Sequence, residues 1–182
     1  MNTLLEKDGL RGNVVRSLVW GGALVLLLLP GIAMRFTEEV RWTAEDFVFA
    51  GIMLLTVCIA YELAARRARD NRYMLAAGIA VGAGFLTVWA NLAVGILGSE
   101  DNPANLWFFV VPAVAMAGAA VARLRPRGLA AAMQLAAAAQ FAIGLGLFVT
   151  GLGNAWVFTG LMCAAWLTAA ALFARARAEK RG

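Results

Sequence analysis

The fold is decided by residues 47–97, which read FVFAGIMLLTVCIAYELAARRARDNRYMLAAGIAVGAGFLTVWANLAVGIL. Two apolar runs, 47–65 and 74–97, flank a short segment that contains four arginines, Arg66, Arg67, Arg69 and Arg72. A helix needs about 20 apolar residues to cross a bilayer, and each run is close to that length. Backbone groups in hydrocarbon must form hydrogen bonds within their own segment. The stretch therefore predicts two membrane-spanning helices joined by a basic loop.

The same pattern continues on both sides of this stretch, in apolar runs at residues 17–34, 106–123, 129–150 and 154–174. The chain is 62% hydrophobic, whereas about half of a typical soluble domain is apolar. Six spans with short loops occupy nearly all of the 182 residues. We predict an all-α membrane protein, a bundle of six transmembrane helices built as three hairpins, with residues 1–182 forming a single domain.

The distribution of basic residues predicts the orientation of these spans. All but two of the 16 Lys and Arg residues lie in alternate connecting segments, which share one face of the membrane. The opposite face has Arg35 and Arg41 together with six acidic residues, Glu38, Glu39, Glu45, Asp46, Glu100 and Asp101. Loops rich in Lys and Arg stay in the cytoplasm. We expect a multi-pass protein of the bacterial inner membrane with both termini cytoplasmic. Lipid headgroups, rather than nucleic acid, account for the net charge of +5.

The first span has a second interpretation. A basic start, the run Leu24–Leu29 and the small residues Gly31 and Ala33 also resemble a secretory signal peptide, whose cleavage would leave five spans. The run from Ser17 to Met34 is longer than the apolar core of a typical signal peptide, so we expect a membrane helix.

The outer turns carry helix-capping residues with a tryptophan nearby. Thr43 and Asp46 have the spacing of a capping box. Asn102 fits an N-cap, because Pro103 then takes the first helical position. Asn154 precedes the last span in the same way. At the inner side, Glu62 is one turn from Arg66, which predicts an ion pair within the helix.

Small residues predict close helix packing inside the bundle. The motif Gly78-x-x-x-Gly82 lies in the third span, and the fifth span is rich in alanine. Prolines at 30 and 112 are expected to bend the first and fourth spans.

Two sets of polar residues are candidates for function. The outer acids Glu38, Glu39, Asp46, Glu100 and Asp101 either attract a cation or only complement the basic inner face. Asn91, deep in the outer half of the third span, either hydrogen-bonds another helix or lines a cavity. Gln134 and Gln140 in the fifth span have the same two interpretations.

The residue types that are missing argue against catalysis. Histidine is absent, and no charged residue lies near the middle of any span. Proton-coupled transporters and membrane proteases depend on such groups. We expect no cofactor, no metal and no enzymatic activity, with a membrane enzyme as the third-ranked alternative.

Two outer segments also carry a resemblance. AMRFTEEVRW at 33–42, and WANLAVGILGSEDNPAN at 89–105, are similar to signatures of a family of small bacterial polytopic membrane proteins of uncharacterised function, and RPRG at 125–128 resembles its inner-loop motif. The resemblance implies that Asn91 and the loop from Gly98 to Asn105 belong to one unit. It implies no activity.

The leading functional hypothesis is a non-enzymatic accessory, assembly or sensing component, or a homo-oligomer, that acts through helix–helix contacts. Its partners would be the lipid bilayer and another membrane protein or a second copy. The alternative is a small channel or facilitator for a cation or small solute, with an acidic outer mouth. The candidate functional positions are Asn91, Glu100, Asp101, Asn102, Asn105, Glu38, Glu39 and Asp46.

Overall fold

The computed structural model describes residues 2–99 and 101–176, with side chains from Val14 onward. This part of the chain is helical throughout and contains no strand. Its elements are α1 (Asn2–Ala33), α2 (Ala44–Arg67), α3 (Asn71–Ala93), the 3₁₀ helix η1 (Pro103–Phe109), α4 (Val110–Val121), α5 (Pro126–Val149) and α6 (Trp156–Arg175). Six segments are long and apolar enough to cross a membrane, with η1 and α4 together forming the fourth. The predicted all-helical, multi-span architecture is confirmed at this level.

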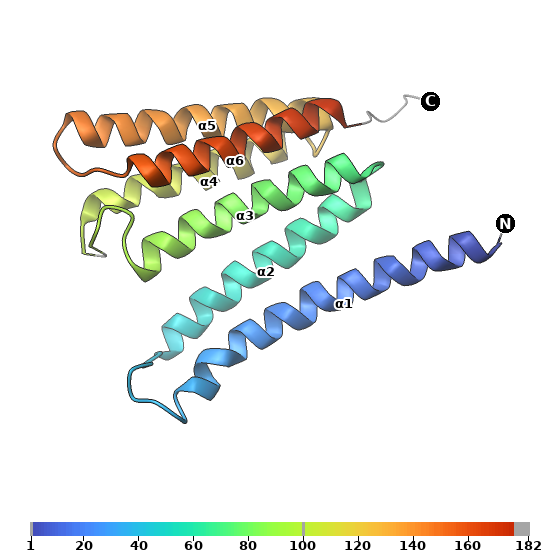
Figure 1. The fold of residues 1–182 in the computed structure, drawn as a ribbon, viewed down its shortest axis with the longest axis horizontal. Helices are drawn as coiled ribbons and strands as arrows, with labels where there is room; N and C mark the ends of the chain where they lie inside the picture. Colours follow the sequence, from blue (N-terminus) through green and yellow to red (C-terminus); the bar gives the residue numbers. More distant parts are fainter. Residues whose placement is uncertain (1, 100, 177–182) are drawn as a thin grey trace. The chain divides into compact units, whose positions relative to one another are not determined.

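The chain divides into two units, residues 1–63 and residues 64–182, which we describe separately. In the first unit, α1 and α2 run in opposite directions and are joined by the loop 34–43 (Figure 1). Near this loop, the Phe47 ring lies 3.5 Å from the position that a Cβ on Gly31 would take. Near the other end, Arg16 of α1 binds Glu62 of α2. The hairpin is therefore held at both ends by side-chain contacts.

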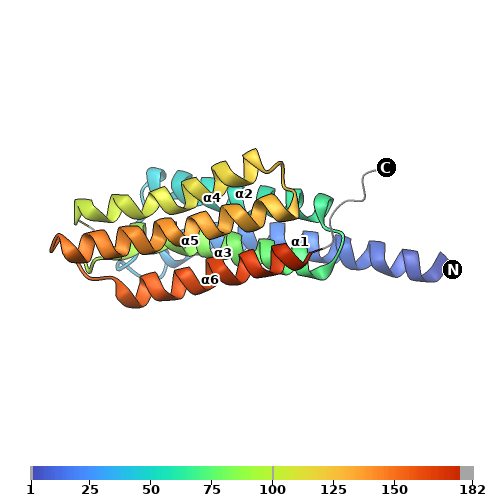
Figure 2. The ribbon, with the colours of Figure 1, turned by 90° about the horizontal axis from the view of Figure 1, so that it is seen from above.

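In the second unit, α5 packs against both α4 and α6, and α3 packs mainly against α6. Figures 1 and 2 show these helices running alongside one another. Although α3 and α4 follow each other in the chain, they share few contacts. In this predicted hairpin, α3 therefore has α6 as its main neighbour, and α4 has α5.

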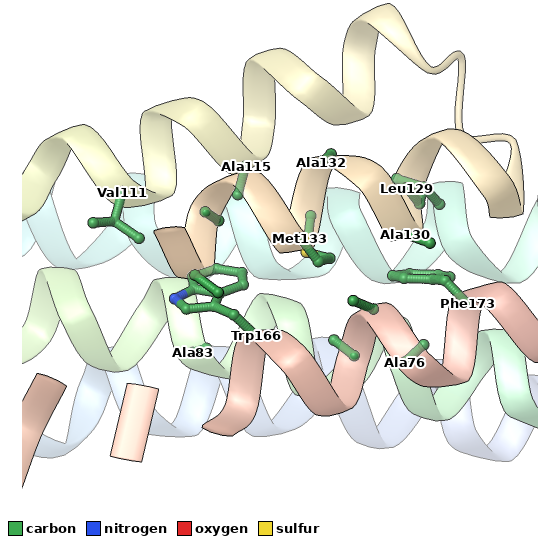
Figure 3. Close-up of a cluster of buried hydrophobic side chains, with 14 of the residues drawn as sticks. Ala76, Ala83, Val111, Ala115, Leu129, Ala130, Ala132, Met133, Trp166 and Phe173 are labelled. Carbon is green, nitrogen blue, oxygen red and sulfur yellow. The ribbon is translucent and has the colours of Figure 1, made fainter. Parts of the chain in front are cut away.

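Apolar side chains from α3, α4, α5 and α6 form the core of this unit. Trp166 lies at its centre with 1% of its surface exposed. Figure 3 shows its ring among Ala83, Val111 and Met133. Around it are alanines, including Ala136 and Ala169, that are fully buried. The alanine-rich sequence of α5 thus lets neighbouring helices approach closely.

The closest helix contacts are not at the predicted glycine motif. A Cβ on Gly118 would lie 2.5 Å from the Cβ of Ala132, and a Cβ on Gly144 would lie 2.5 Å from the Thr159 hydroxyl. A Cβ on Gly78 or Gly82 would meet no atom within 4 Å. Gly118 and Gly144 therefore allow close helix approach in this unit, because a methyl group at either position would overlap a neighbouring helix.

The end of α3 differs from the predicted boundary, and a proline lies near the start of α4. Helix α3 ends at Ala93, and Gly95 then takes a left-handed conformation with φ of 69°. Pro112 lies in the first turn of α4, directly after the 3₁₀ helix η1. The bend expected at Pro112 stays a prediction.

Candidate functional site

The outer acids of the first unit have local roles. A single oxygen of Asp46, Oδ2, accepts hydrogen bonds from the Thr43 backbone N–H at 2.7 Å and from the Thr43 hydroxyl at 2.9 Å. The Asp46 backbone N–H lies 3.4 Å from the Thr43 hydroxyl, which completes the predicted capping box. Glu38 and Glu39 lie in the exposed loop 34–43, where Arg41 is 4.0 Å from the Glu38 carboxylate. Asp46 thus stabilises the start of α2.

The acids of the second unit lie in the loop before η1. Asp101 is exposed, and its backbone N–H donates to the Ser99 hydroxyl at 3.3 Å. Glu100 lies outside the described residues. Among the side chains that the structure describes, no group of three or more carboxylates, thiols or imidazoles is arranged to hold a metal ion.

Asn102 and Asn105 organise this loop. Asn102 Oδ1 accepts from the Ala104 backbone N–H at 3.0 Å, as the predicted cap requires. Asn105, only 4% exposed, accepts from the Leu97 N–H at 2.9 Å and donates to the Ser99 carbonyl at 2.7 Å. Both ends of the Asn105 amide are therefore satisfied within the loop. These contacts assign Asn102 and Asn105 a structural role in shaping the outer loop.

Asn91 is different, because its amide is buried and unpaired. It is 5% exposed on α3, and neither Oδ1 nor Nδ2 has a hydrogen-bond partner. Its neighbour one turn earlier, Thr87, donates to the Ala83 carbonyl at 2.8 Å and so satisfies its own hydroxyl. Among the candidate functional positions predicted from the sequence, Asn91 is thus the one that is buried with both amide atoms lacking a hydrogen-bond partner.

Three further side chains share this property. Gln140 of α5 is fully buried with its amide unpaired, and Thr159 and Trp166 of α6 are each 1% exposed with an unpaired hydroxyl and indole N–H. An unpaired buried polar group costs about 1–3 kcal/mol relative to one with a partner. A cluster of four such residues therefore requires an explanation. Gln134, the other predicted glutamine, is exposed.

Contacts between helices place Thr159 and Gln140 on one interface, about one helical turn apart. Thr159 lies against Gly144, and the Cys163 thiol lies 3.5 Å from the Ala137 carbonyl. Because α5 and α6 are antiparallel, Gln140 lies between these two contacts. Gln140 and Gly144 are four residues apart and so share one face of α5. The Gln140 side chain and the Thr159 hydroxyl therefore lie on the same interface.

Asn91 of α3 lies at a similar level. A Cβ on Gly84 would lie 3.8 Å from the Trp166 ring, and Tyr73 packs on Phe173 with centroids 5.2 Å apart, so α3 and α6 are antiparallel. Asn91 follows Gly84 by seven residues and Thr159 precedes Trp166 by seven, which is about 10 Å along each helix. Counted from the Gly84–Trp166 contact the two residues are level, and counted from the Tyr73–Phe173 contact they differ by four residues. Asn91 and Thr159 therefore lie within about one helical turn of each other along the axis.

The indole N–H of Trp166 points to this level. In Figure 3 the Trp166 nitrogen is on the side of the ring away from Phe173, toward Val111. In α6, Thr159 lies on that same side of Trp166. Four buried groups from three helices thus lie toward the end of the unit that contains the loop before η1, and we call Asn91, Gln140, Thr159 and Trp166 the polar layer.

All four side chains of the polar layer are uncharged. Its two amides donate and accept hydrogen bonds, the hydroxyl does both, and the indole only donates. Asn91 and Gln140 are candidates that the sequence predicts, whereas Thr159 and Trp166 carry no such signal. A spacing of seven residues puts these two on one face of α6, and that spacing is the only local sign of their association.

Comparisons with protein-family models, curated proteins and solved structures give no match to this chain.

Proposed function

We propose that this chain is a non-enzymatic, multi-pass protein of the bacterial inner membrane with both termini in the cytoplasm. It acts through contacts of its helices with a partner membrane protein or a second copy of itself. The positive-inside distribution of Lys and Arg supports the orientation. The absence of histidine and of charges in the middle of the spans supports a role without catalysis.

The observation that carries this proposal is the contrast in burial between the spans. No residue in the apolar stretch of α1 is buried. In the apolar stretches of α3, η1–α4, α5 and α6, 28–39% of the residues are buried. Helices α3 to α6 share a core of their own. Large apolar side chains such as Leu24 and Leu28 of α1 are more than half exposed. Away from its contacts with α2, helix α1 therefore offers apolar side chains to lipid and to other transmembrane helices.

A native pull-down in mild detergent tests this proposal. A tagged chain expressed beside an untagged or differently tagged copy is expected to retain either that copy or another membrane protein in stoichiometric amount. Recovery of the chain as a monomer, with no protein partner after extraction in several mild detergents, would contradict it.

A second candidate, a facilitator for a small uncharged solute, is favoured by the polar layer. The acidic residues support it less, since Asp46 is engaged in a helix cap. Proteoliposomes that contain the purified chain alone would then accelerate solute entry, and Asn91→Leu would reduce that flux. An accessory protein leaves the flux at the level of empty liposomes.

A further inference from the structure

We propose that the polar layer is a binding site for a small neutral molecule that both donates and accepts hydrogen bonds, such as a primary carboxamide. The site lies within residues 64–182, between α3, α5 and α6. This inference goes beyond the assembly role proposed above and does not depend on it, because equilibrium binding requires neither a partner nor transport.

The first argument is the number of buried groups that protein atoms leave unpaired. Asn91 and Gln140 each leave both amide atoms unpaired, and Thr159 and Trp166 add a hydroxyl and an indole N–H. Each of the four residues is at least 95% buried. Buried polar groups in folded proteins are nearly always hydrogen-bonded, to protein or to a bound molecule. The sites of helical bundles are likewise built from inward-facing side chains of adjacent helices.

The second argument is the convergence of these groups. Thr159 lies on Gly144, which shares a helix face with Gln140, and Asn91 is within about one helical turn of Thr159 along the axis. The Trp166 nitrogen points to the same end of the unit (Figure 3). Donors and acceptors from three helices therefore lie within about one to two helical turns of one another in the same part of the core.

The chemistry of the layer selects a neutral ligand. All four groups are uncharged, and an ion moved into an apolar interior without a charged partner loses its hydration. A carboxamide matches the layer, since its carbonyl accepts from the Trp166 indole and its amide group pairs with the amides of Asn91 and Gln140. Acetamide and acetate have nearly the same shape but differ in charge. They form a matched pair of probes.

The test is NMR spectroscopy of the full chain in lipid nanodiscs with ¹⁵N-labelled tryptophan. The indole N–H signal that disappears in Trp166→Phe is assigned to Trp166. Acetamide is expected to shift this signal in a saturable way, whereas acetate at the same concentration leaves it in place. The indole signals of Trp42 and Trp107, which lie in the outer turn and in η1, serve as internal references.

Variants then assign the shift to the polar layer. Gln140→Leu is expected to weaken the apparent affinity for acetamide about tenfold, because it removes the amide partner. Gln134→Leu is the matched control, since it makes the same change at an exposed position of the same helix. Thr159→Val keeps the shape of the side chain and removes only the hydroxyl. It provides a second measurement if Gln140→Leu does not fold.

Three results would overturn the proposal. The first is the absence of a saturable acetamide shift at Trp166. The second is an equal affinity for acetamide in the wild type, Gln140→Leu and Thr159→Val. The third is an equal response to acetate, which would show that the site does not exclude charge.

Discussion

Arg16 Nε and Nη2 donate to the two carboxylate oxygens of Glu62, at 2.5 and 2.6 Å, across 46 residues of sequence. The Trp20 indole N–H lies 3.4 Å from the same carboxylate. Bidentate pairs between a guanidinium and a carboxylate are stronger and more directional than other ion pairs. The side chain of Glu62 is 16% exposed and that of Arg16 is 50% exposed. Water therefore stabilises the charge of Arg16 better than that of Glu62, and the ion pair matters more to Glu62. This pair ties α1 to α2 within residues 1–63.

The pair makes an asymmetric prediction. Arg16→Gln is expected to lower the melting temperature in detergent more than Glu62→Gln, because it removes the bidentate partner of a carboxylate that is only 16% exposed. Combining Arg16→Glu with Glu62→Arg is expected to recover part of the loss. Glu38→Gln, at an exposed position of the outer loop, is the control and should change nothing. Equal effects of all three single substitutions would show that the pair does not stabilise the hairpin.

Gly144 and Gly146 make a matched pair in α5. A Cβ on Gly144 would lie 2.5 Å from the Thr159 hydroxyl, whereas a Cβ on Gly146 meets nothing within 4 Å. We expect Gly144→Ala to destabilise the protein by about 1–2 kcal/mol through overpacking. Gly146→Ala should be neutral or stabilising by up to about 1 kcal/mol, because alanine favours the helix. Reversible unfolding in mixed micelles measures both, and Thr159→Ala should relieve the effect at Gly144. A Gly144→Ala variant as stable as the wild type would refute the close approach.

Asn105 is predicted to hold the outer loop in shape. Asn105→Ala removes the partners of the Leu97 N–H and the Ser99 carbonyl, and we expect a loss of about 2 kcal/mol. Asn154→Ala removes a single exposed bond to the Trp156 N–H, 3.2 Å long, and should cost about 1 kcal/mol or less. Hydrogen exchange at residues 95–99 is the direct readout. It should accelerate in Asn105→Ala and remain unchanged in Asn154→Ala.

The turn between α4 and α5 contains two non-glycine residues in the left-handed region, Arg123 at φ of 50° and Leu124 at 59°. Tyr73 donates its hydroxyl to the Leu124 carbonyl at 2.9 Å, and Arg67 donates to the Arg123 carbonyl at 3.1 Å. Such conformations persist only where the surroundings hold them. Tyr73→Phe is therefore expected to cost about 1–2 kcal/mol and to increase proteolysis at this turn. Tyr61→Phe is the control, and an equal effect of both substitutions would argue against this role.

Local features of the fold were predictable because their signals are local. The spans follow from apolar runs, and the caps at Thr43 and Asn102 follow from residues two or three positions apart. The start of η1 at Pro103 follows from the preference of proline for the first helical position. The end of α3 at Ala93 was missed, although Gly95, which follows it in a left-handed conformation, is a local signal for the end of a helix.

Long-range relationships carried no comparable signal. The Arg16–Glu62 pair joins residues 46 positions apart. The sequence pattern pointed instead to Arg66, one turn from Glu62, as the partner. Gly78 and Gly82 have the spacing of a packing motif, yet the contacts of residues 64–182 form at Gly118 and Gly144. Thr159 and Trp166 lie in an apolar helix, so their unpaired polar atoms became visible only when α3 and α5 were placed beside α6.

Site-specific photo-crosslinking in native membranes tests the proposed helix–helix role most directly. A benzoyl-phenylalanine replaces Leu24 or Leu28 on α1, and Leu161 or Leu167 on α6 serves as the control, because all four positions are 52–62% exposed. We predict intermolecular protein adducts from the α1 positions, to a second copy or to a partner, and mainly lipid adducts from α6. Lipid adducts alone at all four positions would contradict the account.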